Sequence, residues 1–102
     1  MTYEEYLTAR HELVEKSKQL SEVTIEQYVN RFHNLQRRGI YTDEREVTDE
    51  ILQQIEQQYK NGLQHYPIPL RYYLEYLDYL DQAAEVLAEK ESSEVENTLV
   101  QV

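Results

Sequence analysis

The stretch LSEVTIEQYVNRFHNLQRRGI, residues 20–40, decides how this chain folds. Ser21 and Thr24 are both good helix N-caps, and Gln27 follows Thr24 at the spacing of a capping box. Arg37 and Arg38 suit the negative end of a helix dipole, and the glycine that follows them suits a helix stop. The apolar face of this stretch consists of Ile25, Tyr28, Val29, Phe32 and Leu35. We therefore expect an amphipathic helix that begins near Ser21 or Thr24 and ends before the glycine.

Two further helices are expected on either side of this one. Thr2-x-x-Glu5 is another capping box, and the apolar spacing after it predicts a helix over about residues 3–18. After a polar loop at 40–47, Thr48 should cap a third helix that ends at Gly62.

A fourth helix should follow the two prolines of the chain. Proline disfavours helix in the residue before it, so Tyr66-Pro67-Ile68-Pro69 is expected to be a rigid, extended lead-in. The helix itself should span about residues 69–90. The expected fold class is thus all-α, a compact bundle of four or five short helices. Residues 1–90 form a single helical domain, and residues 91–102 form a flexible tail that can also dock.

The composition excludes several classes of function. The chain of 102 residues has no cysteine, so it holds neither disulfides nor thiolate metal sites. His11, His33 and His65 lie on separate elements without metal-ligand spacing. No glycine-rich phosphate loop or nucleophile–base group is present, so we expect no enzyme, no cofactor, no metal and no small-molecule substrate. The N-terminus lacks a signal peptide pattern and no apolar run is long enough for a membrane, so a cytoplasmic protein is expected.

The net charge of −10 is unevenly distributed. Residues 1–40 contain six Lys or Arg and six Asp or Glu, whereas residues 41–102 contain four Lys or Arg and fourteen Asp or Glu. Nonspecific binding to nucleic acid requires clustered basic residues. The overall charge argues against such binding, but the neutral first forty residues do not.

The expected fourth helix has three faces at helical spacing. Its leucine face is core, and its acidic face, with Glu75, Asp78, Asp81, Glu85 and Glu89, is interpreted as a solvated surface. The third face carries Tyr72, Tyr76 and Tyr79. Tyrosine suits both half-wet packing and interfaces. Two interpretations stay open: another part of the chain covers this face, or it binds a second copy or a protein partner.

The order of these elements resembles the N-terminal core-binding, SAM-like domain of phage integrases and other tyrosine recombinases. The resemblance covers about residues 3–82. The positions that match are Tyr6-Leu7, Leu20-Ser21, Thr24, Tyr28, Phe32, Leu35, Gly39-Ile40, Val47-Thr48 through Gly62, and Leu70 through Leu80. The family clamps DNA with this domain and carries its catalytic residues in a following domain. The resemblance therefore implies a stand-alone, non-catalytic relative, a regulatory or accessory protein of a phage or mobile element.

DNA binding would fall to polar side chains on and before the second helix, because Arg, Lys, Asn and Gln reach phosphates and base edges. The candidates are Lys16, Lys18, Gln27, Arg31, Asn34, Arg37 and Arg38. The fourth helix is acidic where the DNA-facing helix of the family is usually basic. Three hypotheses thus remain: binding of duplex DNA, a protein-interaction module that uses the tyrosine face, and an acidic mimic of DNA.

Overall fold

The structure, a computed structural model, describes the backbone of residues 1–101 and the side chains of residues 1–88. Within that range the chain forms five helices and no strand, which confirms the all-α fold. The helices are α1 (Tyr3–Leu13), α2 (Glu22–Arg37), α3 (Asp49–Gln58), α4 (Gly62–His65) and α5 (Pro67–Gln101). The last of these has 35 residues, so the expectation of uniformly short helices is wrong for α5.

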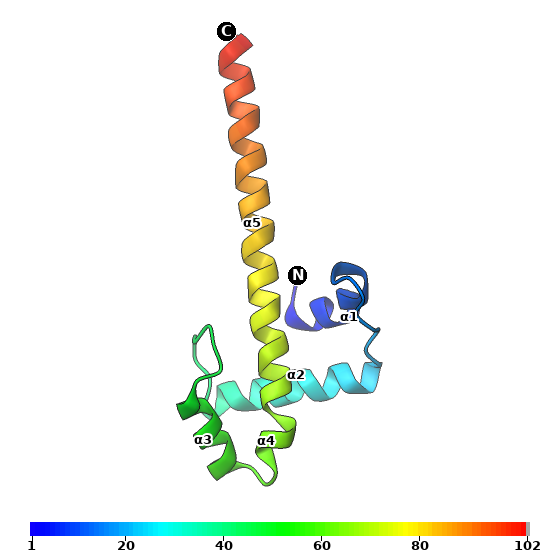
Figure 1. The fold of residues 1–102 in the computed structure, drawn as a ribbon, viewed down its shortest axis with the longest axis vertical. Coiled ribbons are helices and arrows are strands. Elements are labelled where there is room, and N and C mark those ends of the chain that lie inside the picture. Colours follow the sequence, from blue (N-terminus) through cyan, green and yellow to red (C-terminus); the bar gives the residue numbers. More distant parts are fainter. Residues whose placement is uncertain (102) are drawn as a thin grey trace.

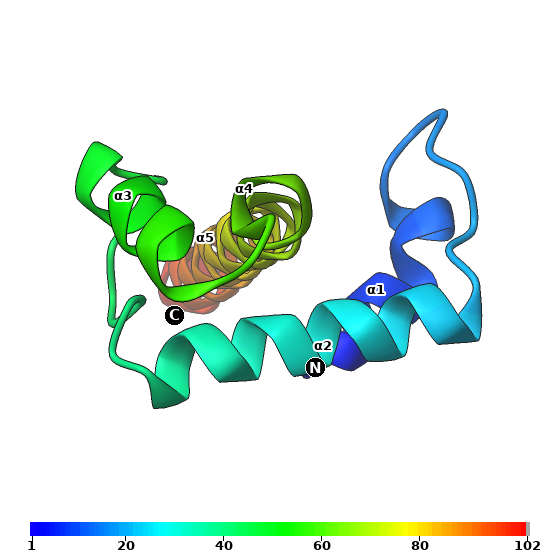
Figure 2. The ribbon, with the colours of Figure 1, turned by 90° about the horizontal axis from the view of Figure 1, so that it is seen from below.

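The long helix α5 is the axis on which the other helices assemble. Figure 1 shows α2 crossing the lower part of α5, α1 beside its middle, and α3 and α4 at its lower end. Seen from below, α2 runs past α5, with α1 at one end of α2 and α3 near the other (Figure 2). The upper part of α5 extends beyond all of these elements, and the molecule is 65 Å long in this direction.

Helix α1 has the expected start and an earlier end. The Thr2 side chain accepts from the Glu5 amide and the Glu5 side chain accepts from the Thr2 amide, which confirms the capping box. The helix ends at Leu13 and does not continue to residue 18 as predicted. Lys16 has a φ of 65°, a left-handed conformation that no helix accommodates, and the Ser17 hydroxyl donates to the main-chain oxygen of Val14 at 2.6 Å.

Helix α2 starts from the earlier of its two expected caps. The Ser21 hydroxyl accepts from the Thr24 amide at 3.1 Å, so Ser21 is the N-cap and the capping box predicted at Thr24 is not formed. At the other end Gly39 has a φ of +70°, as expected of a glycine stop. The amides of Ile40 and Tyr41 both return to the Leu35 oxygen, which turns the chain into the loop before α3.

Helix α3 begins where it was expected but ends before Gly62. Thr48 caps it through the Ile51 amide at 3.2 Å, and Tyr59 is already extended. Gly62 opens α4 instead of closing α3. A Cβ at this position would lie 2.7 Å from the Ile55 oxygen, so α3 and α4 approach each other more closely than any side chain allows.

Both prolines lie inside the first turn of α5, so the predicted extended lead-in is wrong. Tyr66 is itself in the helical region, with φ −95° and ψ −32°. The first amides of a helix have no intrahelical partner, so Pro67 and Pro69 remove no hydrogen bond there. The backbone of α5 continues past the expected end near Lys90. The prediction that residues 91–102 form a flexible or docking tail concerns side chains outside the described residues.

Aromatic rings join three helices in the core. Phe32 of α2 stacks on Tyr73 of α5 with ring centres 3.8 Å apart, and Tyr3 of α1 meets both rings edge-on at 5.3 Å. The Tyr3 hydroxyl donates to the Pro69 oxygen at 2.7 Å, so the buried phenol is satisfied. Three helices are thus joined through one cluster of rings, which fixes the direction in which α5 leaves the bundle.

Candidate interaction surface

The tyrosine face of α5 lies largely under α1. Tyr76 is only 8% exposed, and its hydroxyl donates to the main-chain oxygen of Met1. Tyr79 packs beside the Tyr6 ring at 5.5 Å, and Tyr72 stacks on Tyr28 of α2 at the same distance. The structure thus places Tyr76 in the core, and it is not part of an exposed partner surface. Tyr72 and Tyr79 stay half-buried at its edge.

Glu75, which the sequence assigned to the solvated acidic face, joins α5 to α1. Its Oε1 accepts from the Tyr6 hydroxyl at 2.8 Å and from Arg10 Nε at 3.0 Å. The Arg10 guanidinium also lies over the Tyr72 ring, 4.7 Å from its centre. Burial, together with the bond to Glu75, raises the pKa of the Tyr6 phenol. These interactions hold α1 against α5, and the sequence analysis did not predict them.

The residues proposed for DNA binding do not gather in one patch. Lys16 and Lys18 are exposed in the loop before α2, whereas Arg37 lies in its last turn and Arg38 is its C-cap. The two ends of α2 are about 25 Å apart at the usual helical rise. Figure 2 shows the loop and the last turn at opposite ends of the helix. Between them, Gln27 is exposed and Arg31 is half-buried.

Two of these DNA-binding candidates are engaged with α3. Asn34 Oδ1 accepts from the Tyr59 hydroxyl at 2.8 Å. The Arg38 guanidinium lies 4.5 Å from the centre of the same ring, and its Nη1 donates to the Gln58 oxygen at 3.3 Å. These contacts hold the end of α2 against α3. A phosphate or base of DNA would have to displace these contacts before it could bind Asn34 or Arg38.

The acidic face of α5 is partly neutralised by the loop before α3. Arg45 Nη2 lies 3.1 Å from Asp81 Oδ2, and its Nη1 lies 3.7 Å from Asp78 Oδ1. All three side chains are more than half exposed, so the two ion pairs contribute little to stability. These contacts place the positive charge of Arg45 among the acidic side chains of α5 that an acidic mimic of DNA would need.

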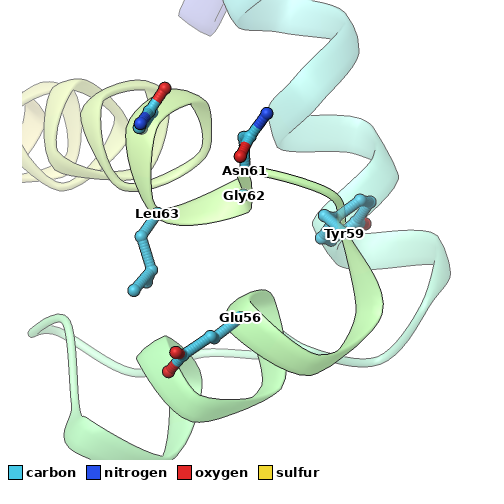
Figure 3. Close-up of a pocket in the computed structure, with 6 residues that line it drawn as sticks. Glu56, Tyr59, Asn61, Gly62 and Leu63 are labelled. Carbon is cyan, nitrogen blue, oxygen red and sulfur yellow. The ribbon is translucent and has the colours of Figure 1, made fainter.

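Two open pockets of the bundle bring together no set of side chains suited to catalysis or metal binding. One lies at the corner of α3 and α4, where Leu63 projects from α4 toward α3 beside Glu56 (Figure 3). A second, between α1 and the start of α2, is lined by Leu20, Ile25 and three glutamates. Over the described residues, no three acidic or histidine side chains are placed to hold a metal ion. Nor does any described helix combine the length and the apolar character needed to cross a bilayer.

An apolar surface without a partner among the described residues lies on α5 above the bundle. Every side chain from Asp81 through Ala88 is exposed, including Val86 at 63% and Leu87 at 60%. Tyr79, Gln82 and Ala83 line an open groove with these two residues. We call the apolar residues of this stretch, together with half-buried Tyr79 and Leu80 at its lower edge, the distal surface; they are Tyr79, Leu80, Ala83, Ala84, Val86, Leu87 and Ala88. The sequence placed them on core and tyrosine faces, and only the structure shows that the bundle ends near Leu80.

Comparisons with known protein families, with curated proteins and with solved structures find no match to this chain, so the site is interpreted from its own geometry.

Proposed function

We propose that this chain is a non-catalytic protein-interaction module, and that its distal surface binds an amphipathic helix. The observation that supports this proposal is the apolar seam of α5, which does not stop where the bundle stops. Its members follow one another at alternating intervals of three and four residues: Leu70, Tyr73, Leu77, Leu80, Ala84 and Leu87.

The lower part of this seam already binds helices of the same chain. Leu70 is fully buried, and Tyr73 stacks on Phe32 of α2. Leu80 packs partly against the core, and above it Ala84 and Leu87 keep the same spacing but have no partner within the described residues. Because an interval of 3.5 residues keeps one side of a helix facing a neighbouring helix, the seam favours a helical partner over an extended peptide.

The acidic side chains do not interfere with such a partner. At 100° per residue, Glu85 lies about 160° around the helix from Leu87. A helix that docks on Leu87 therefore leaves the acidic face in solvent, where it maintains solubility.

Protein binding fits this geometry better than binding of duplex DNA. Asn34 and Arg38 already contact Tyr59. Lys16 and Lys18 lie at the opposite end of α2 from Arg37, and Arg31 between them is half-buried. DNA affinity depends on several cations that meet neighbouring phosphates. Because the chain resembles the recombinase domain, duplex DNA is the alternative ligand in the test described below.

The test is a titration with a labelled designed peptide that carries leucine at heptad positions a and d and lysine at e and g. We expect the peptide to bind the unmodified protein and to lose at least about tenfold in affinity for Leu87→Lys, a cost of about 1.4 kcal/mol. Glu85→Gln is the matched control, since it changes the net charge by the same single unit on the opposite face, and it should bind within about twofold of the unmodified protein.

Two results would overturn the proposal. One is equal peptide affinity for Leu87→Lys and Glu85→Gln. The other is salt-sensitive binding of duplex DNA that the double change Arg31→Ala and Arg38→Ala abolishes, because the functional surface would then be on α2.

A further inference from the structure

The distal surface has a symmetry that a surface for an unrelated helix would not need. The segment from Leu80 to Leu87 reads Leu-Asp-Gln-Ala-Ala-Glu-Val-Leu. Its two leucines lie at equal distances from the midpoint between Ala83 and Ala84. All four residues fall within about 100° of one side of α5 at helical spacing.

We infer that the helix bound by the distal surface is the same segment of α5 from a second copy of this chain, antiparallel about a twofold axis between Ala83 and Ala84. This inference rests on the proposed function, because it identifies the occupant of the same surface. A twofold interface must be self-complementary, so each residue meets its mirror position in the other copy. Here Leu80 of one copy faces Leu87 of the other, and alanine faces alanine at the axis.

The alanines also determine how closely the two helices pack. The distance between helix axes depends on the side chains at the point of contact. Methyl groups at the axis allow a close approach, and the flanking leucines then pack over the partner backbone on both sides. Helices α1 and α2 flank the lower part of α5, up to Tyr79 beside the Tyr6 ring, so the two copies of α5 cross at an angle instead of running side by side for their whole length.

The charges allow this pairing and predict how salt affects it. Asp81 and Glu85 lie on the side of α5 away from the axis, so no carboxylates meet at the contact. Each copy nevertheless carries a net charge of −10, which opposes association at long range. Added salt screens this repulsion, so it should strengthen the dimer. A basic partner would show the opposite dependence.

The contact is small, and a weak dimer is therefore expected. The segment from Leu80 to Leu87 is about 12 Å long, and Leu80 at its lower end is already half-buried against the core. A pair of such segments buries less than the roughly 800 Å² per partner of a standard stable interface. We expect a dissociation constant of about 0.1 mM, which places the monomer–dimer equilibrium in the range of analytical ultracentrifugation.

The first measurement is the mass of the intact chain as a function of concentration and salt. It should rise from 12.3 kDa toward twice that value, and it should rise further when sodium chloride is added. Leu87→Lys should remain a monomer, and Glu85→Gln should associate as the unmodified protein does. A mass that stays at one chain at millimolar concentration, or an association that salt weakens, would overturn the inference.

The second measurement uses the absence of native cysteine to locate the axis. Ala84→Cys should form an intermolecular disulfide at least about tenfold faster than Glu85→Cys, because a disulfide requires Cβ atoms about 4 Å apart. A mixture of Leu80→Cys and Leu87→Cys should give mainly the mixed disulfide. Equal rates for positions 84 and 85, or homodimers only from the mixture, would overturn the antiparallel arrangement.

The two sets of results separate this inference from the proposed function. A chain that stays monomeric yet binds the designed peptide through Leu87 has a helix-binding surface whose natural partner is another protein. A chain that neither associates nor binds the peptide has no helix-binding surface, and both statements fall.

Discussion

Replacing Glu75 by leucine should weaken the contact between α1 and α5 without disturbing the α5 helix itself. Glutamate and leucine are both good helix formers, so the effect of the change on helix propensity is small. The loss comes from the two hydrogen bonds that end on Glu75 Oε1, one from the Tyr6 hydroxyl and one from Arg10 Nε. Any change in stability therefore reports on the contact between the two helices.

The magnitude follows from the burial of the three groups. Tyr6 is 1% exposed, so its hydroxyl would lose its acceptor at a cost of about 1–2 kcal/mol. The Arg10 and Glu75 side chains are 17% and 34% exposed, so their pair lies between the surface and the buried case and contributes about 1 kcal/mol. Arg10 keeps its contact with the Tyr72 ring, which limits its loss. Glu75→Leu should thus reduce the free energy of unfolding by about 2–3 kcal/mol.

Equilibrium unfolding in urea, followed by circular dichroism, measures this change. Glu75→Gln keeps an acceptor oxygen and should cost about half as much, whereas the matched change Glu85→Gln on the exposed face should cost almost nothing. A double-mutant cycle between Glu75→Leu and Tyr6→Phe should give a coupling of about 1 kcal/mol. A coupling near zero, or equal stabilities for the two glutamine variants, would refute the conclusion that Glu75 holds α1 against α5.

Two further predictions concern the packing of α3 and the aromatic core. Gly62→Ala should destabilise the protein by about 2 kcal/mol or more, because a Cβ would lie 2.7 Å from the Ile55 oxygen, whereas Gly39→Asn, in open space, should cost less than half as much in the same urea assay; equal costs would contradict the close approach. Burial raises the pKa of four core tyrosines, Tyr3, Tyr6, Tyr41 and Tyr76. A raised folded pKa gives stability that is complete below the unfolded value near pH 10 and is lost above it, by about 1.4 kcal/mol per pH unit for each phenol that stays protonated. Tyrosinate absorbance and helix content should therefore change together above pH 10, and ionisation without loss of helix would show that the rings are not held in the core.

The sequence predicted those parts of the fold that local chemistry controls. The helix from Ser21 to Gly39 depends on a cap, an apolar stripe and a glycine stop, all within one stretch, and the structure confirms it with Ser21 as the cap. The prediction that Thr48 caps the third helix is confirmed for the same reason. The role of Gly62 could not be predicted, because it depends on how closely α4 approaches Ile55 after the chain has folded.

The candidate site was harder to predict because helical spacing does not show which face of α5 is covered, or for how far. Tyr76 and Leu87 both belong to apolar faces in the sequence, yet one lies under α1 and the other is exposed above the bundle. Glu75 lies at the border between the acidic and tyrosine faces. Its partner Arg10 is 65 residues away in the sequence, and no local pattern connects them.

The uneven charge of the chain follows from this architecture. The neutral N-terminal part supplies α1 and α2, which must pack on other helices, and Arg10 meets its counter-charge on α5. The acidic part supplies α5, which projects from the bundle with an apolar seam that would promote nonspecific aggregation on an uncharged helix. Acidic residues opposite this seam restrict apolar contact to one side of α5, and in the inferred dimer the repulsion between copies would keep the small interface weak and sensitive to salt. The charge that argues against DNA binding is thus the charge that the proposed helix-binding surface would require.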